Sequence, residues 1–140
     1  MQSDIEKHEK IVAETLDHLH EYASQANLEK YLALFSERAV FMGTDKDERW
    51  PMAAFRPYVA KRFEGGTGWT YRATERNIDV AADGKSAWFD ERLSHETGEA
   101  RGSGVLVLED GTWRIAQYNL CFPIPNALLR PFRDIIRVVG

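Results

Sequence analysis

The stretch "ARGSGVLVLEDGTWRIAQYNLCF", residues 100–122, decides the fold. Two runs in which apolar and polar residues alternate flank the dipeptide Asp110-Gly111, the strongest short signal for a tight β-hairpin. Because a two-residue turn fixes the register, Leu108 should pair with Trp113, and the apolar residues two positions farther along should pair in turn. The stretch therefore predicts two long antiparallel strands with one shared apolar face.

Similar segments precede this hairpin. Asp83-Gly84 and Thr97-Gly98 separate two further strand-like runs, so residues 69–123 are predicted to form an antiparallel meander of four strands. If Thr97-Gly98 is the second turn, Glu91 lies opposite Gly104, and a four-residue loop would keep the same register.

The first half of the chain is patterned differently. Apolar residues at three- and four-residue spacings predict helices over residues 3–27, 28–36 and 51–63, with a short strand at residues 37–42 and a loop at residues 43–50. Residues 1–68 thus form a helical half with one short strand. We expect an α+β fold in which a curved antiparallel β-sheet packs on three N-terminal helices.

Composition narrows the function. With 140 residues, 44% of them hydrophobic, the chain is predicted to be one domain, residues 1–140. A net charge of −4 argues against nucleic acid as a partner. No apolar run approaches the length of a membrane span and the start is charged, so we expect a cytoplasmic protein with no membrane partner. The single cysteine, Cys121, excludes an internal disulfide.

The predicted register places polar residues on the buried face. One row across the four strands contains Arg76, Glu91, Gly104 and Gln117, and the next contains Thr74, Leu93, Gly102 and Asn119. Glycine within a strand often marks a close approach, so we interpret these glycines as clearing space beside a carboxylate. The pattern predicts an apolar cavity with a polar end. A bulge between Arg101 and Ser103 would instead turn Gly102 outward.

Three segments together resemble a known family: "FMGTDKDERW", "AWFDERL" and "RGSGVLVLEDGTWRIAQYNLCFPIPN". With three helices ahead of a meander, the chain resembles the SnoaL-like branch of the nuclear transport factor two superfamily, which includes ketosteroid isomerase-like proteins. The resemblance implies a cone-shaped, cystatin-like roll with a pocket between sheet and helices, and a homodimer formed through the outer face of the sheet. Members include isomerases, dehydratases, hydrolases, cyclases and noncatalytic binding proteins, so fold alone does not select an activity.

The chemistry proposed for this face has two forms. In the first, Glu91 is a catalytic acid or base and Arg76 sets its charge, in a cofactor-independent isomerase, lyase, cyclase or hydrolase that acts on a small apolar or amphipathic molecule. The predicted substrate-binding residues are Gln117, Asn119, Trp113, Phe89, Trp50 and Gly104. In the second, Arg76 and Glu91 are a structural ion pair in a noncatalytic carrier or a dimerising accessory domain.

The remaining features are weaker. His8, His18 and His20 lack metal-site spacing and are predicted to be surface residues of the first helix, and no metal or cofactor is expected. The C-terminal segment, residues 124–140, is rich in apolar residues. It is predicted to be a lid over the wide end of the cone or an arm that contacts a second subunit.

Overall fold

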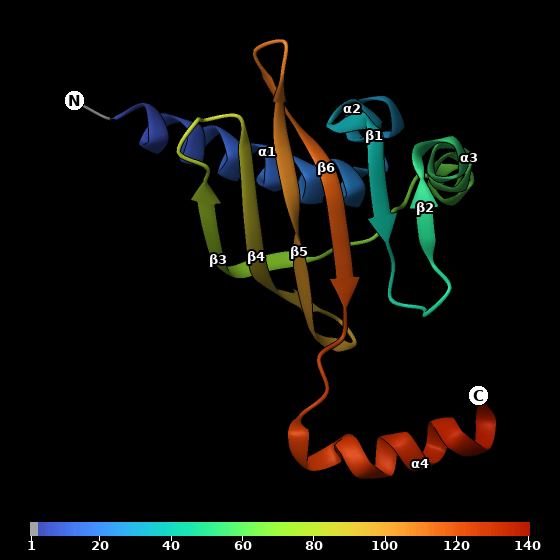
Figure 1. The fold of residues 1–140 in the computed structure, drawn as a ribbon. Coiled ribbons are helices and arrows are strands. Elements are labelled where there is room, and N and C mark those ends of the chain that lie inside the picture. The colour runs from blue at the N-terminus through green and yellow to red at the C-terminus, as the bar shows by residue number, and fades with distance from the viewer. Residues whose placement is uncertain (1–2) are drawn as a thin grey trace.

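A computed structural model describes residues 3–140 and shows the expected α+β arrangement, with the N-terminal helices packed on one side of a curved sheet (Figure 1). The helices are α1 (Asp4–Gln25), α2 (Leu28–Ala33), α3 (Met52–Phe63) and α4 (Leu129–Val139), with a short 3-10 turn, η1 (Asn126–Leu128), before the last. The strands are β1 (Phe35–Met42), β2 (Arg49–Pro51), β3 (Arg72–Val80), β4 (Ser86–His95), β5 (Gly98–Glu109) and β6 (Thr112–Cys121).

The sheet has six strands in the order β2-β1-β6-β5-β4-β3, and the predicted meander supplies β3 to β6. Strand β1 runs parallel to β6, and β2 pairs antiparallel with β1. Residues 43–50 were predicted to be a loop, but this was wrong for the last two residues, Arg49 and Trp50, which belong to β2. A turn in which the Glu48 amide donates to the Asp45 carbonyl at 3.1 Å lets Arg49 and Trp50 return along β1.

Helix α1 provides the main cover for the sheet and lies across its inner face (Figure 1). It begins where the Ser3 hydroxyl accepts a hydrogen bond from the Glu6 amide, and its apolar stripe is fully buried. That stripe consists of Val12, Leu16, Leu19 and Ala23. It packs with buried residues of α2, α3 and all the long strands except β3, so a single core lies between the sheet and the helices.

The β4–β5 turn differs from the prediction. His95 pairs with Gly98, so the two turn residues are Glu96 and Thr97 rather than Thr97 and Gly98. The His95 ring contacts the Thr97 hydroxyl at 2.7 Å and accepts from the Thr97 amide at 3.2 Å, which fixes the turn at this position. The register moves by two residues. An even shift leaves every side chain on its predicted face, but it changes the partners.

Strand β6 contains a β-bulge that the sequence analysis did not place. Leu106 pairs with Ile115, whereas the preceding residue, Val105, pairs with Gln117, so Ala116 is the extra residue. Beyond the bulge the faces exchange, because one added residue changes the phase of the alternation. The prediction that Gln117 faces the core was therefore wrong.

The C-terminal segment, residues 124–140, does not pack on the rest of the protein. Every residue from Phe122 to Gly140 is exposed, and α4 lies apart from the sheet and the other helices (Figure 1). Among residues 3–140, no helix is both long and apolar enough to cross a membrane.

Candidate functional site

The central polar feature of the core is the carboxylate of Glu91 on β4, which is 1% exposed. Its Oε2 accepts hydrogen bonds from Arg76 Nε at 3.1 Å and Nη2 at 3.0 Å. Its Oε1 lies 2.8 Å from His20 Nε2 and accepts from the Tyr118 hydroxyl at 3.2 Å. We call Glu91, Arg76, His20 and Tyr118 the Glu91 cluster. Strands β3, β4 and β6 and helix α1 each contribute one member.

Arg76 also ties the cluster to α1. Its Nη1 donates to Asp17 Oδ1 at 2.8 Å and to the Ala13 carbonyl at 3.2 Å. The Arg76 side chain is only 13% exposed, whereas that of Asp17 is 66% exposed. The guanidinium therefore bridges a buried carboxylate and a solvated one, and its donors join the sheet to the helix that covers it.

The electrostatics of the cluster favour an ionised carboxylate. Burial by itself would raise the pKa of Glu91, but the hydrogen bond and charge of His20, followed by the charge and hydrogen bonds of Arg76, outweigh it and lower the pKa. Burial and the Glu91 charge raise the pKa of the Tyr118 phenol well above its usual value. Tyr118 is therefore a neutral hydrogen-bond donor to a negative Glu91.

Two glycines of β5 make this packing possible, but they do not leave a cavity. A Cβ at Gly102 would lie 2.1 Å from the Tyr118 hydroxyl oxygen and 3.2 Å from Glu91 Cγ. A Cβ at Gly104 would lie 1.9 Å from the Gln117 carbonyl oxygen, at the bulge. The space that the sequence analysis assigned to a ligand is filled by Tyr118 and by backbone.

An aromatic groove opens between the β1–β2 loop, α3 and the chain that leads into β3. Its volume is about 190 Å³. The Trp50 ring stacks on Tyr58 with centroids 4.5 Å apart. The groove is lined by Phe41, Gly43, Thr44, Glu48, Trp50, Tyr58, Arg62, Trp69, Tyr71 and Leu120. We call it the mouth groove.

A second, narrow internal space lies beside this groove and is lined by two members of the Glu91 cluster. The space holds only about 10 Å³, and its walls include His20 and Tyr118. It shares four lining residues with the mouth groove, Phe41, Trp69, Tyr71 and Leu120. The same side chains therefore border the mouth groove on one side and the space lined by His20 and Tyr118 on the other.

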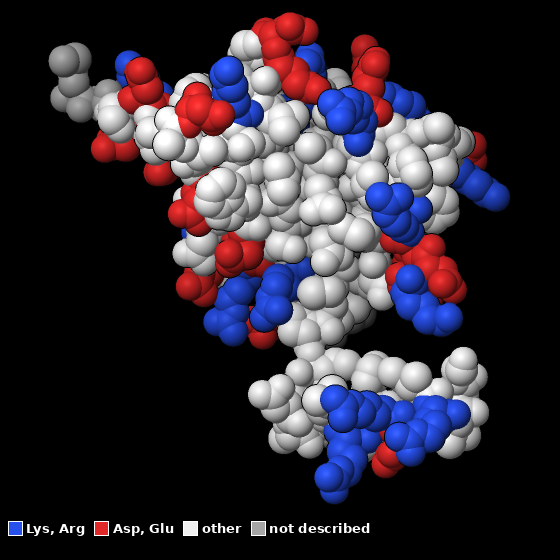
Figure 2. All heavy atoms as spheres, in the orientation of Figure 1, with Lys and Arg blue, Asp and Glu red and all other residues white. Residues whose placement is uncertain are grey.

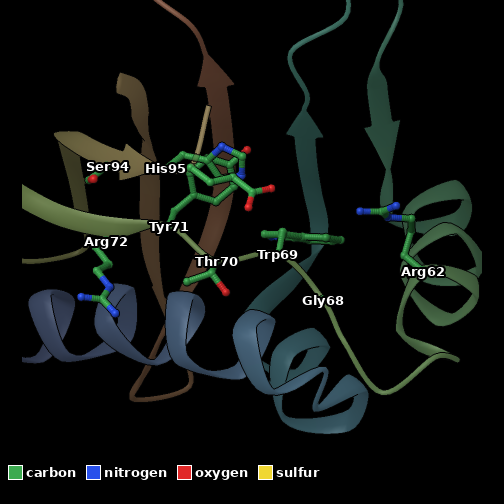
Figure 3. Close-up of a pocket in the computed structure, with 9 residues that line it drawn as sticks. Arg62, Gly68, Trp69, Thr70, Tyr71, Arg72, Ser94 and His95 are labelled. Carbon is green, nitrogen blue, oxygen red and sulfur yellow. The ribbon is translucent and has the colours of Figure 1, made fainter. Parts of the chain in front are cut away.

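A wider and more open depression adjoins the mouth groove and is shown in Figure 3. Its volume is about 790 Å³, and it shares Arg62, Trp69 and Tyr71 with the mouth groove. Tyr71 stacks on His95 with centroids 4.5 Å apart, and the Arg62 guanidinium lies 5.7 Å from the Trp69 ring centre. Aromatic faces and the Arg62 cation thus lie between the open depression and the mouth groove.

The structure brings some of the predicted site residues together and separates others. Glu91 and Arg76 are in contact, Phe89 packs on Tyr118 with centroids 5.7 Å apart, and Gly104 lies opposite both aromatic residues. Trp50 lines the mouth groove.

The other three predicted residues lie elsewhere. Gln117 is exposed and Asn119 is half-buried on the outer face, because the bulge reverses their orientation. Trp113 is buried and donates from Nε1 to His8 Nδ1 at 3.0 Å. It lines neither the mouth groove nor the internal space.

The sequence analysis missed several residues of the site, above all His20 and Tyr118. The prediction that His20 is a surface residue was wrong: its side chain is 14% exposed and reaches Glu91. A signal was present, because His20 follows Leu16 by four residues and so lies beside the buried stripe of α1. Trp69 and Tyr71 lie between α3 and β3, where no periodicity marks an inward face.

The cluster contains groups that are chemically able to exchange a proton. Among residues 3–140, no group of three or more His, Cys, Asp or Glu side chains is arranged to hold a metal ion. A histidine held by an ionised carboxylate, beside a neutral phenol, is an arrangement that can give or accept a proton.

Comparison with known proteins agrees with the fold. Among curated proteins, no sequence matches the chain. Three solved structures illustrate the likeness. An NTF2-like protein of unknown function from Pseudomonas putida has a TM-score of 0.68 at 10% identity and covers 82% of this chain and 86% of its own.

A putative scytalone dehydratase from Novosphingobium aromaticivorans has a TM-score of 0.70 at 14% identity and covers 89% of each chain. The association domain of C. elegans CaMKII has a TM-score of 0.67 at 11% identity and covers 85% of this chain and 98% of its own. At such identities these likenesses show the fold alone.

The model of the SnoaL-like domain matches residues 12–125. This span runs from the first buried residue of α1 to the end of the segment that follows β6, and it includes all six strands and the Glu91 cluster. The chain belongs to the SnoaL-like domain family and has the nuclear transport factor 2-like fold.

Proposed function

We propose that this protein binds a small, largely apolar molecule in the mouth groove and that the Glu91 cluster transfers a proton to or from it. The proposed ligand class is a planar or alicyclic compound with one polar oxygen. Aromatic residues make up half of the lining, while Glu48 and Arg62 supply the charged groups that would orient a ligand. The observation that carries the proposal is the shared wall between the mouth groove and the internal space that His20 and Tyr118 border.

The members of the cluster have different proposed roles. His20 borders the internal space, so its imidazole is the group that would exchange a proton with the ligand. Glu91 holds His20 at 2.8 Å and Arg76 keeps Glu91 ionised, so these two act as positioning residues in the proposed reaction. The neutral Tyr118 phenol would stabilise a developing oxyanion if the ligand displaced its bond to Glu91.

The narrowness of the internal space favours a second candidate function. With about 10 Å³ free and four hydrogen bonds to Glu91 in place, the cluster is also suited to a purely structural role. The mouth groove would then belong to a noncatalytic carrier. The same fold occurs in the putative scytalone dehydratase and in the CaMKII association domain, so the fold is compatible with both candidates.

The test uses 2-tetralone, an aromatic ketone with exchangeable hydrogens next to its carbonyl. Proton NMR in deuterium oxide would follow both binding, by saturation transfer, and exchange of those hydrogens. We expect the unaltered protein to bind the ketone and to accelerate the exchange. His20→Gln should abolish the acceleration and keep binding, whereas Trp50→Ala should weaken binding itself. Trp88→Ala, on the outer face, is the matched control and should change neither.

The outcomes separate the two candidates. Binding that depends on Trp50 without any exchange above background would establish the carrier and reject proton transfer. Binding that persists equally in Trp50→Ala and Trp88→Ala would reject the mouth groove as the ligand site.

A further inference from the structure

Helix α4 is strongly amphipathic, yet its apolar side is exposed. Its five apolar residues Leu129, Phe132, Ile135, Ile136 and Val139 fall within one face at helical spacing, and their exposed fractions run from 37% to 82%. Arg130, Arg133 and Arg137 fall on the opposite face. Figure 2 shows basic side chains gathered along one side of this helix. The pattern is that of a helix that packs one face on another surface.

The chain's own body does not cover this face. Among the described residues, the one element in substantial contact with α4 is η1, the turn that precedes it. Pro123 and Pro125 flank Ile124 in the connection from β6, and a segment with alternate prolines is stiff and extended. An isolated helix of 11 residues is marginal in water. The helix therefore needs an external surface, and the connection directs it away from its own sheet.

The outer face of the sheet is a suitable surface. Figure 2 views the side opposite α1, and its centre is uncharged, with acidic and basic side chains around the margin. Trp88 of β4 is 51% exposed there and lies opposite Val105 of β5. Val107 and Ala116 are half-buried on the same face. An exposed tryptophan among aliphatic residues with a charged margin is typical of a protein interface.

We propose that α4 of one protomer packs its apolar face on the outer sheet face of a second copy of this chain, around Trp88, and that the second copy returns the same contact. The polar side of α4 carries three arginines and one aspartate, whereas the whole chain has a net charge of −4. The arm is thus basic and the body acidic. Asp79 pairs with Trp88 across the strands, and Asp90 follows it by two residues, so carboxylates stand beside the docking position.

The area that such an interface would bury is large enough for a stable dimer. Two arms exchanged about a two-fold axis would bury on the order of 2,000 Å² in total, within the range of stable homodimers. This inference concerns assembly and does not depend on the proposed ligand or on proton transfer.

The test measures the mass of the full chain in solution by light scattering during gel filtration. We expect a dimer. Phe132→Ser/Ile136→Ser, on the apolar face of α4, should give a folded monomer. The matched pair Arg133→Ser/Arg137→Ser, on the opposite face of the same helix, should retain the dimer at moderate ionic strength. Trp88→Asp should also give a monomer, and circular dichroism would confirm that each variant is folded.

Mixing two of the monomeric variants distinguishes exchange between chains from packing within one chain. The Phe132→Ser/Ile136→Ser chain keeps an intact sheet face, and the Trp88→Asp chain keeps an intact arm. Together they can form one of the two arm contacts, so we expect a fraction of heterodimer. Failure to form any heterodimer would contradict exchange.

Two other results would overturn the proposal. The unaltered chain could be a monomer at tens of micromolar, or its dimer could survive the apolar-face substitutions. A monomer that binds vesicles of phosphatidylserine and phosphatidylcholine through α4 would instead identify a lipid surface as the partner of the apolar face.

Discussion

The Glu91 cluster and the mouth groove differ in how tightly their side chains are packed. In the Glu91 cluster, four polar side chains are packed with almost no free space, and no buried side-chain nitrogen or oxygen among the described residues lacks a hydrogen-bond partner. In the mouth groove, Trp50, Tyr58, Trp69 and Tyr71 are half-buried and face open space. Folding alone satisfies the cluster, whereas it leaves the aromatic faces of the mouth partly uncovered. The first region should therefore control stability, and the second should control binding.

The largest expected loss of stability comes from Arg76→Met. Removing the guanidinium leaves the buried Glu91 carboxylate without its permanently charged partner, which typically costs about 3–5 kcal/mol. Urea unfolding would measure the change. The control is Arg92→Met, since Arg92 forms exposed ion pairs with Glu75 and Glu99 and should cost under about 1 kcal/mol. Equal losses in the two variants would show that the cluster has no special role in the fold.

Gly104→Ala should have the next largest effect. The added Cβ would lie 1.9 Å from the Gln117 carbonyl oxygen, so the strand or the bulge must move. Overpacking of this kind costs about 1–3 kcal/mol, and more where backbone obstructs it. Gly65→Ala, where nothing lies within 4 Å of the new Cβ, is the control and should be close to neutral in thermal unfolding. A neutral Gly104→Ala would refute the close approach at the bulge.

Acid should reduce the contribution of the Glu91 cluster to the free energy of unfolding. The pKa of Glu91 is lowered on folding from an ordinary value of 4.5, so the stability that the ionised group provides is fully present above pH 4.5. It is lost as the pH falls through the lower, folded pKa. The free energy of unfolding of Glu91→Gln should depend less on pH in this range than that of the unaltered protein. Parallel curves below pH 4.5 would contradict an ionised Glu91.

The smallest loss of stability is expected for Trp50→Ala at the mouth. Its stacking on Tyr58 is a partly exposed aromatic pair, worth about 0.5–1.5 kcal/mol beyond the area that it buries. Affinity for 2-tetralone should nevertheless fall at least tenfold, as measured by NMR titration. A variant that loses much stability and no affinity would reverse the assignment of the two regions.

The sequence predicted the parts of the fold that depend on local signals. Asp110-Gly111 and the alternation around it gave the pairing of Leu108 with Trp113, and the apolar stripe gave α1. The site residues depended on register, which a single bulge changes. The sequence contained a sign of that bulge, because Trp113 and Ile115 alternate in one phase whereas Tyr118 and Leu120 alternate in the other.

Other parts of the site were beyond a reading of local pattern. Whether Glu91 meets His20 depends on how α1 lies on the sheet, across 71 residues of sequence. The β1–β6 pairing is likewise a contact between distant segments, and no turn signal in the sequence links β1 to the strand that it joins. Tertiary packing, rather than propensity, sets these positions.

The most direct measurement is a two-dimensional NMR spectrum of the histidine side chains, recorded with and without 2-tetralone. His20 borders the internal space, whereas His8 is bonded to Trp113 away from the mouth groove and serves as an internal control. If the mouth groove leads to the Glu91 cluster, the His20 resonances shift on addition of the ketone and those of His8 do not, and Trp50→Ala suppresses the shift. If binding at the mouth leaves His20 unchanged, the groove and the cluster are separate, and the proposed proton transfer is wrong.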